Sequence, residues 1–98
     1  MEVDDLKEPV RLVWNIAGRV QGVGFRFTAQ MLAQSFEIKG FVRNEWDGAV
    51  HMEVEGQRAE VESFVAEVYR SRLGRYIQGD NKAWRSATGA FDGFEIQY

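Results

Sequence analysis

The chain contains no cysteine and only one histidine among its 98 residues. Without cysteine there is no disulfide, no thiolate nucleophile and no cysteine-based zinc site, and His51 alone cannot build a multi-histidine metal centre. Proline is almost absent too, with one residue, whereas 13% of the residues are aromatic. That composition is untypical of a disordered chain. The sequence therefore predicts a small folded domain without thiol chemistry.

The chain also has no excess of positively charged residues. Twelve lysines and arginines face 15 aspartates and glutamates, which gives a net charge of −3. Residues 1–8 hold four carboxylates and one lysine, so the rest of the chain is neutral overall. Sequence-independent nucleic-acid binding needs a basic surface, which this balance argues against. No apolar run approaches the ~20 residues of a membrane span, and the acidic start does not resemble a signal peptide. We expect a soluble, cytoplasmic protein with no nucleic-acid or membrane partner and, at this size, a monomer.

Apolar periodicity predicts the secondary structure. Alternation predicts a strand from residue 10 to about residue 20, and further strands over residues 37–44, 49–54 and 91–98. Helical spacing of apolar residues predicts one helix that begins near Phe25 and another over residues 58–72. Residues 76–87 fit either one bent strand or two short ones, because Gly79-Asp80-Asn81 interrupts them.

This order of elements predicts a ferredoxin-like α+β sandwich. Two helices would cover one face of a mostly antiparallel sheet of four or five strands. We expect one domain over residues 9–98, preceded by a flexible acidic tail of residues 1–8. In such a fold the first two strands run in the same direction on either side of the third. The turn after the first strand and Asn44, at the end of the second, should therefore meet at one edge.

The turn after the first strand is rich in glycine and is followed directly by a helix. Its sequence is Gln21-Gly22-Val23-Gly24-Phe25-Arg26. Glycines let successive backbone N–H groups point into one concavity, and the start of a helix adds unpaired N–H groups. The Arg26 guanidinium would add a planar fork that matches a phosphate. The glycine spacing fits neither nucleotide-binding fingerprint, and an ordinary connecting turn explains it equally well.

Asn44 is the second candidate functional residue. An amide accepts and donates hydrogen bonds at once, so Asn44 could orient a water molecule toward a phosphorus bound at the glycine turn. A structural explanation competes with this hypothesis. Asparagine tolerates a left-handed conformation before the Asp47-Gly48 turn, and for Asn44 taken alone that explanation is favoured.

Residues 18–26 (GRVQGVGFR) and 40–50 (GFVRNEWDGAV) together resemble the two signature stretches of the acylphosphatase family. The resemblance extends to Gly56 and to the terminal GFEIQY, and so covers nearly the whole chain. It implies metal- and cofactor-independent hydrolysis of small-molecule acyl phosphates to a carboxylate and inorganic phosphate. It further implies that Arg26 binds the phosphoryl group and Asn44 orients the attacking water. The phosphate would also be bound by the backbone of five residues: Gln21, Gly22, Val23, Gly24 and Phe25.

One part of the chain departs from this family. Relatives usually have a Gly-Pro pair after the second helix, where this chain has Leu73-Gly74-Arg75. The structure and role of residues 74–88 therefore stay open, as does the role of a basic stretch over residues 69–86. The favoured interpretation of that stretch is a dipolar surface, and the weaker one is a docking patch for an anionic partner.

Two other functions remain as alternatives. A non-catalytic module of the same fold would bind anions or a protein without turnover. RNA binding is suggested by Lys39-Gly40-Phe41-Val42, which resembles part of an RNA-recognition signature but lies on the wrong strand.

Three residues near the predicted site have roles that the sequence leaves open. Glu45 could act as a base but fits a solvated turn better. Trp46 could flank the acyl group or simply be exposed. The C-terminal carboxylate of Tyr98 could reach Arg26.

Overall fold

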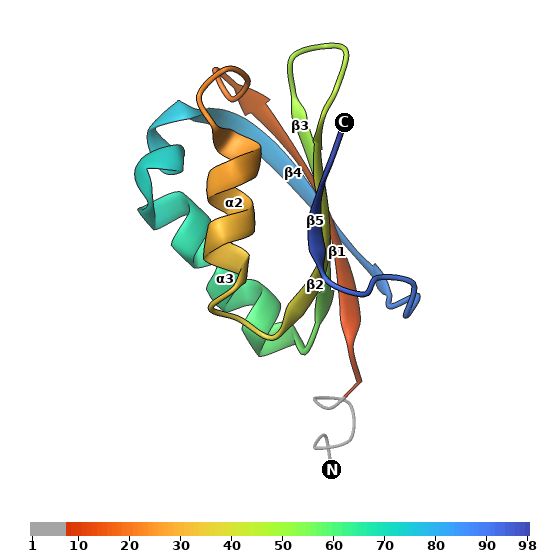
Figure 1. Cartoon of the computed structure of the whole chain (residues 1–98). Helices are drawn as coiled ribbons and strands as arrows, with labels where there is room; N and C mark the ends of the chain where they lie inside the picture. Colours follow the sequence, from red (N-terminus) through yellow and green to blue (C-terminus); the bar gives the residue numbers. More distant parts are fainter. Residues whose placement is uncertain (1–7) are drawn as a thin grey trace.

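The computed structural model describes residues 8–98 (Figure 1). Two α-helices, one 3-10 helix and five strands follow one another in the order β1, α2, β2, β3, α3, η1, β4, β5. Their bounds are β1 Val10–Gly18, α2 Phe25–Ala33, β2 Ile38–Asn44, β3 Val50–Gly56, α3 Arg58–Arg70, η1 Arg72–Tyr76, β4 Ile77–Ser86 and β5 Phe94–Gln97. Residues 1–7, which hold most of the predicted acidic tail, lie outside the described residues.

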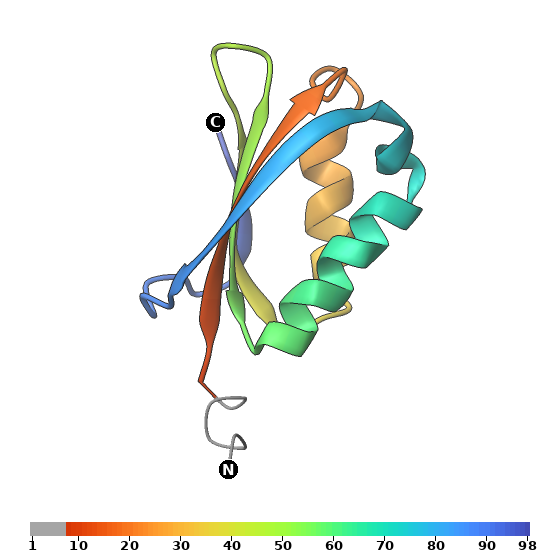
Figure 2. The same ribbon diagram turned by 180° about the vertical axis from the view of Figure 1, so that it is seen from behind.

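The strands form one sheet in the order β4-β1-β3-β2-β5. Every neighbouring pair is antiparallel except β2 and β5, which are parallel. Both α-helices lie on the same face of this sheet, as Figures 1 and 2 show from opposite sides. The predicted ferredoxin-like α+β sandwich is therefore confirmed, with five strands. Within residues 8–98, neither helix is long and apolar enough to cross a membrane.

The core lies between the sheet and the helices and follows the predicted periodicities. Leu12, Trp14 and Ile16 of β1 are fully buried, as the alternation predicts. The apolar stripe of α3 packs into the same core. It consists of Val61, Phe64, Val65 and Val68. A helix or strand with one apolar face is stable only when that face is covered, which is why these two layers form.

Strand β4 is a single strand rather than two. It pairs with β1 from Val10↔Ser86 to Gly18↔Ile77, with a register shift only at Ala17/Gly18. The polar residues in its middle do not break it because Asp80 is bonded inward. The Asp80 Oδ2 atom accepts a hydrogen bond of 2.7 Å from the Trp14 indole and another from the Tyr69 hydroxyl.

The topology determines which chain ends meet. Strands β1 and β2 both run antiparallel to β3, which lies between them, so they point in the same direction. Their C-terminal ends therefore share one end of the sheet. Strand β5 runs parallel to β2 and brings the C-terminus of the chain to that end as well (Figure 1).

Candidate active site

A hollow of about 220 Å³ lies at this end of the sheet. Its lining joins the glycine turn, the first turn of α2, the end of β2 and the C-terminus, and consists of Val20, Gly22, Gly24, Phe25, Arg26, Phe27, Asn44, Ile96 and Tyr98. Arg26 and Asn44, predicted to act together, thus line the same hollow. Of the predicted loop residues, Gln21 and Val23 do not line it.

The backbone of residues 21–25, called the glycine loop below, contains two left-handed glycines. Gly22 and Gly24 adopt left-handed φ angles of 79° and 75°. Left-handed residues alternating with ordinary ones turn successive N–H groups toward one concavity. Within residues 8–98, the N–H groups of residues 21–24 donate to no backbone carbonyl and no side chain. Those of Gly22 and Gly24, which line the hollow, are therefore free to bond a ligand.

The start of α2 violates the usual preferences of a helix. Its N-cap is Gly24, which has no capping side chain, and its first turn holds no acidic residue. Arg26 places a positive charge there instead. A cation at a helix N-terminus opposes the helix dipole, at a cost of about 0.3–1 kcal/mol. Such a local conflict is typical of a functional site, and here a bound anion would relieve it.

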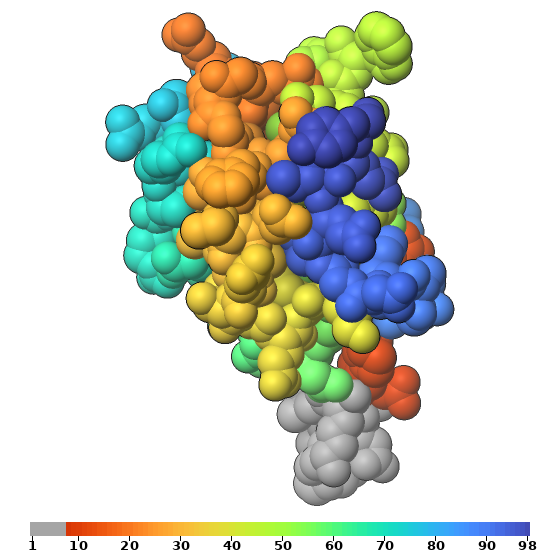
Figure 3. All heavy atoms as spheres, viewed as in Figure 1, coloured from red at the N-terminus to blue at the C-terminus, as the bar shows by residue number. Residues whose placement is uncertain are grey.

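The Arg26 side chain extends toward the C-terminus of the chain. Its Nη1 atom donates to the carbonyl of Gln97 over 3.2 Å, and its guanidinium lies 4.8 Å from the centre of the Tyr98 ring. In Figure 3 the C-terminal residues, in dark blue, lie directly against the orange residues of α2. Arg26 thus meets the ring of Tyr98 and the backbone before it, and among the described residues it forms no ion pair with the terminal carboxylate.

Asn44 is the last residue of β2 and pairs with Val50 across the hairpin. Its backbone is not left-handed, so the structural explanation considered for it does not apply. Among residues 8–98, the Asn44 amide has no hydrogen-bond partner. Every buried side-chain N or O atom in this part of the chain has a partner, so the Asn44 amide is not one of the buried groups. The amide is therefore half-exposed in the hollow and free to bond a water molecule or a substrate oxygen.

Gln21 contributes through its side chain, which the sequence did not indicate. Its Nε2 atom donates to the carbonyls of Glu45, over 2.8 Å, and Ala49, over 2.9 Å. Those two residues close the β2–β3 hairpin through the 2.8 Å bond from Glu45 N to Ala49 O. One amide group thus fixes the hairpin that carries Asn44 to the glycine loop. No motif in the sequence signals this contact, because its acceptors are backbone atoms.

The two other residues near Asn44 have ordinary surroundings. Glu45 forms an ion pair of 2.7 Å with Arg43, and Trp46 is fully exposed in the hairpin turn. Neither lines the hollow. The simpler expectation for each residue, an ordinary place in the turn, thus agrees with its position.

Ile96 and Tyr98 line the hollow although the sequence reasoning named neither side chain. The parallel register of β5 against β2 explains their place. Gln97 lies opposite Arg43, so Tyr98 follows beside Asn44. The terminal strand was predicted, but its partner was not. Nothing in the sequence indicated that the terminal strand pairs with β2, and for that reason these two residues were not predicted to lie at the site.

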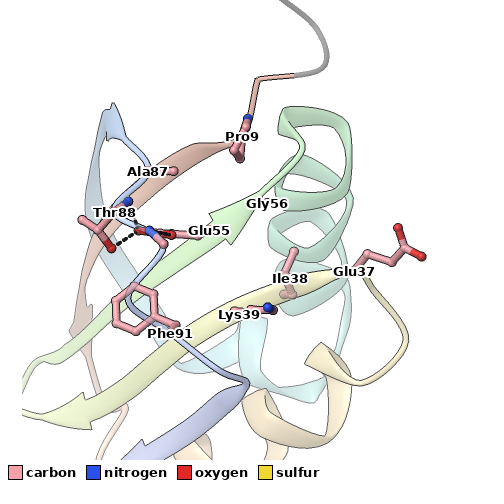
Figure 4. Close-up of a pocket in the computed structure, with 10 residues that line it drawn as sticks. Pro9, Glu37, Ile38, Lys39, Glu55, Gly56, Ala87, Thr88 and Phe91 are labelled. Carbon is pink, nitrogen blue, oxygen red and sulfur yellow. Dashed lines mark hydrogen bonds between the residues drawn. The ribbon is translucent and has the colours of Figure 1, made fainter.

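A second hollow, of about 530 Å³, lies at the opposite end of the sheet (Figure 4). Glu55, in its wall, is almost wholly buried and accepts hydrogen bonds from Thr88 N, Thr88 Oγ1 and Gly89 N. Burial by itself would raise the pKa of the Glu55 carboxyl. The bonds from Thr88 and Gly89 and the charge of Arg11 outweigh burial and lower that pKa. Glu55 therefore anchors the loop between β4 and β5.

The aromatic residue on which the RNA alternative rests is not accessible. Phe41 is only 7% exposed, and its ring lies 5.8 Å from that of His51 and 5.7 Å from that of Phe91. RNA-binding sheets stack bases on exposed aromatic rings. Phe41 offers no such surface.

Metal-ligating side chains do not gather in the described part of the chain, where no three His, Asp or Glu residues are placed to hold an ion. The candidate site is composed of backbone N–H groups, one guanidinium and one amide.

Comparison with known proteins places this chain in a family. An acylphosphatase family model matches residues 12–96. The acylphosphatase of Paenarthrobacter aurescens is 40% identical, over 91% of this chain and 95% of that protein. The acylphosphatase of Salinibacter ruber is 37% identical, over 89% and 92%. The crystal structure of acylphosphatase from Bacillus subtilis matches with a TM-score of 0.83 at 30% identity, over 91% of this chain and 99% of that one. The chain therefore belongs to the acylphosphatase family, enzymes that hydrolyse phosphorus-containing acid anhydrides.

Proposed function

We propose that the protein hydrolyses the carboxyl–phosphate bond of acyl phosphates in the hollow between α2 and β2. The observation that supports this most is the convergence of three different groups. Gly22, Gly24, Arg26 and Asn44 all line one hollow of about 220 Å³. Among residues 8–98, the N–H groups of the glycine loop and the Asn44 amide have no internal partner and could serve a ligand there. The volume of the hollow suits a phosphoryl group and leaves the acyl chain to extend outward.

The phosphoryl oxygens would accept hydrogen bonds from the N–H groups of the glycine loop and from Arg26. Arg26 would exchange its bond to the Gln97 carbonyl for a charged acceptor, which forms the stronger, charge-assisted bond. The Tyr98 ring would keep the guanidinium in place during this exchange. The positive end of α2 adds to the same field.

The Asn44 Oδ1 atom would accept a hydrogen bond from water and aim its oxygen at phosphorus. A P–O bond to water forms as the bond from phosphorus to the acyl oxygen breaks, with the electron pair leaving on the carboxylate. The protons of water end on the phosphate or in solvent. The products are a carboxylate and inorganic phosphate.

This chemistry does not need a strong base in the site. A carboxylate is a good leaving group, and the loose transition state of phosphoryl transfer demands little push from the nucleophile. Stabilising the developing charge and positioning the water supply most of the acceleration. The amide of Asn44 and the donors of the glycine loop match those two tasks.

Hydrolysis of benzoyl phosphate with EDTA present tests the proposal. Removing the guanidinium in Arg26→Ala should lower kcat/KM by about 100-fold or more, since one fixed charged donor in a transition state supplies about 2.7–4 kcal/mol. Asn44→Ala should lower kcat with little change in KM, because it affects water rather than substrate binding. Arg85→Ala, an exposed arginine on β4 outside the hollow, is the matched control and should behave as wild type.

Isotope labelling distinguishes the proposed attack from its alternative. In ¹⁸O-water the label should enter phosphate; label in benzoate would mean attack on the carbonyl carbon. Well-folded wild-type protein that binds phosphate without turnover would indicate a non-catalytic anion-binding module instead.

A further inference from the structure

Arg72 places a second guanidinium beside the glycine loop. It is the first residue of η1, lies within the basic stretch over residues 69–86, and is exposed. Its side chain crosses to α2, where Nη2 donates to Thr28 Oγ1 over 2.8 Å. A residue of the third quarter of the chain is thereby fixed at the first turns of the helix that begins the site.

The same nitrogen lies against Gly24. A Cβ atom added to Gly24 would be only 3.2 Å from Arg72 Nη2. Gly24 lines the hollow and Arg72 does not, so the guanidinium adjoins the loop without touching a group bound in the hollow. The absence of a side chain at position 24 is what allows this approach.

The charge of Arg72 is not neutralised locally. Within residues 8–98, no carboxylate lies within 4 Å of Arg72, whereas Arg43 and Arg70 each form an ion pair. Its hydrogen-bond partner, the Thr28 hydroxyl, is uncharged. The first turn of α2 contains no acidic residue either. The positive potential of Arg72 is therefore added to that of Arg26 and of the helix.

The backbone holds this second charge in place. The N–H group of Arg19 donates to the carbonyl of Tyr76 over 3.1 Å, which ties the start of the site to the end of η1. Ser71, which caps η1, donates its hydroxyl to the carbonyl of Val68 in α3 over 2.7 Å. Arg72 thus lies on a segment anchored to both α3 and the approach to the glycine loop.

We propose that Arg72 is an electrostatic positioning residue of this site, which strengthens the binding of doubly negative phosphoryl groups from behind Gly24. The inference deepens the proposed function, on which it rests. It also gives Arg72, one arginine of the basic stretch over residues 69–86, a role at the site itself. A purely structural tie between η1 and α2 is the competing explanation, and the two differ in their dependence on charge.

Affinity for inorganic phosphate, measured by calorimetry at pH 8 and low salt, tests the charge directly. Arg72→Gln removes the charge and should weaken phosphate binding by about three- to tenfold, as expected for one partly screened unit charge near a dianion. It should raise the KM for benzoyl phosphate by a similar factor while kcat changes less. Arg72→Lys should restore most of the affinity, because a point charge suffices for this role.

Two matched variants control the measurement. Thr28→Val removes the hydrogen-bond acceptor but leaves the charge, and should change phosphate affinity by less than about twofold because no charge is lost. Arg70→Gln removes a neighbouring arginine that is paired with Glu67, and should have no effect. The dissociation constant of phosphate for Arg72→Gln, divided by that for wild type, should fall toward one in about 0.5 M potassium chloride, because salt screens surface charges.

The outcomes separate this inference from the proposed function. Turnover in wild type with unchanged phosphate affinity in Arg72→Gln overturns the role of Arg72 alone. Equal losses in the Gln and Lys variants, or a loss that salt does not reduce, indicate a structural tie and also overturn it. Phosphate binding that depends on the charge of Arg72 without turnover supports the inference and refutes the hydrolase mechanism. Absence of phosphate binding in wild type overturns both.

Discussion

The side chain of Gln21 offers the sharpest test of how the site is assembled. Its single Nε2 group donates to two carbonyls of the hairpin that carries Asn44. Gln21→Glu keeps the shape of the side chain but removes both donors. Two hydrogen bonds of about 1 kcal/mol each are lost, and a part-buried carboxylate then faces two carbonyl oxygens. A total cost of about 2–3 kcal/mol follows from these two effects.

That cost should appear chiefly in catalysis. A hairpin released from the glycine loop no longer fixes Asn44 opposite the bound phosphoryl group. If the full cost falls on the transition state, kcat decreases about 30- to 150-fold. The KM should change less, because the phosphate donors of the glycine loop and Arg26 remain. Steady-state hydrolysis of benzoyl phosphate measures both constants.

The pH dependence of this variant gives a second readout. Burial and the two carbonyl oxygens both disfavour a charged carboxylate, so the pKa of the carboxyl introduced by Gln21→Glu should be raised in the folded protein. The protonated carboxyl can again donate one hydrogen bond. The hairpin contact should therefore be present at low pH and lost as pH rises through that raised pKa. Activity relative to wild type should increase by about fivefold from pH 8 to pH 5, the equivalent of one restored bond of about 1 kcal/mol.

Gln21→Met is the control for this experiment, since it is similar in size and has no titrating group. Its activity relative to wild type should be low and independent of pH. A Gln21→Glu enzyme that is as active as wild type at pH 8 would refute the reasoning. So would a relative activity that does not change with pH while the Met variant is equally impaired.

Three further predictions concern residues around the site and at the opposite end of the sheet. Glu55→Gln should lower the free energy of unfolding by about 2 kcal/mol at pH 7, because a carboxylate that accepts three hydrogen bonds is lost. Since the pKa of the Glu55 carboxyl is lowered in the folded protein, its contribution is present above the unfolded pKa and lost as pH falls through the folded one. Urea titrations should then show the variant and wild type converging in acid, with benzoyl phosphate hydrolysis unchanged at neutral pH; parallel curves would contradict this. Gly22→Ala should cost about 1–2 kcal/mol in stability and weaken phosphate binding, because its φ of 79° disfavours any side chain although the space there is open. Calorimetry with phosphate checks this, and wild-type affinity would show that the loop conformation is not needed. Tyr98→Ala removes the ring beside Arg26 and should raise KM about two- to fivefold, as expected for an exposed cation–π contact, with unfolding unchanged. An unaltered KM would mean that the ring does not position the guanidinium.

Much of the fold could be predicted because its local patterns are strong. Alternation in β1 and the helical stripe of α3 each name the residues that are buried, and Asp47-Gly48 indicates the hairpin between β2 and β3. Strand β4 was ambiguous for a physical reason. Its polar residues resemble a break until Asp80 is seen to bond the indole of Trp14, a residue 66 positions away.

The candidate site divides in the same way. Arg26, Asn44 and the glycines before α2 could be named as candidates from the sequence, but residue type alone left an ordinary turn as an equal or better explanation. The resemblance to the family supplied their expected roles. Their convergence followed from the strand order alone. Side-chain contacts to backbone carbonyls could not be predicted in this way, and the bonds from Gln21 to the hairpin are the clearest example.

The sequence by itself determined the local elements, the absence of thiol chemistry, and the presence of a glycine-rich turn and an asparagine that can meet at one end of the sheet. These features depend on short-range geometry and on residue type. Only the tertiary structure decided that Gln21 fixes the hairpin, that β5 brings Tyr98 beside Arg26 and that Arg72 adjoins Gly24. Each of these contacts joins residues at least 24 positions apart. Such contacts are set by how the layers pack, which no short stretch of sequence specifies.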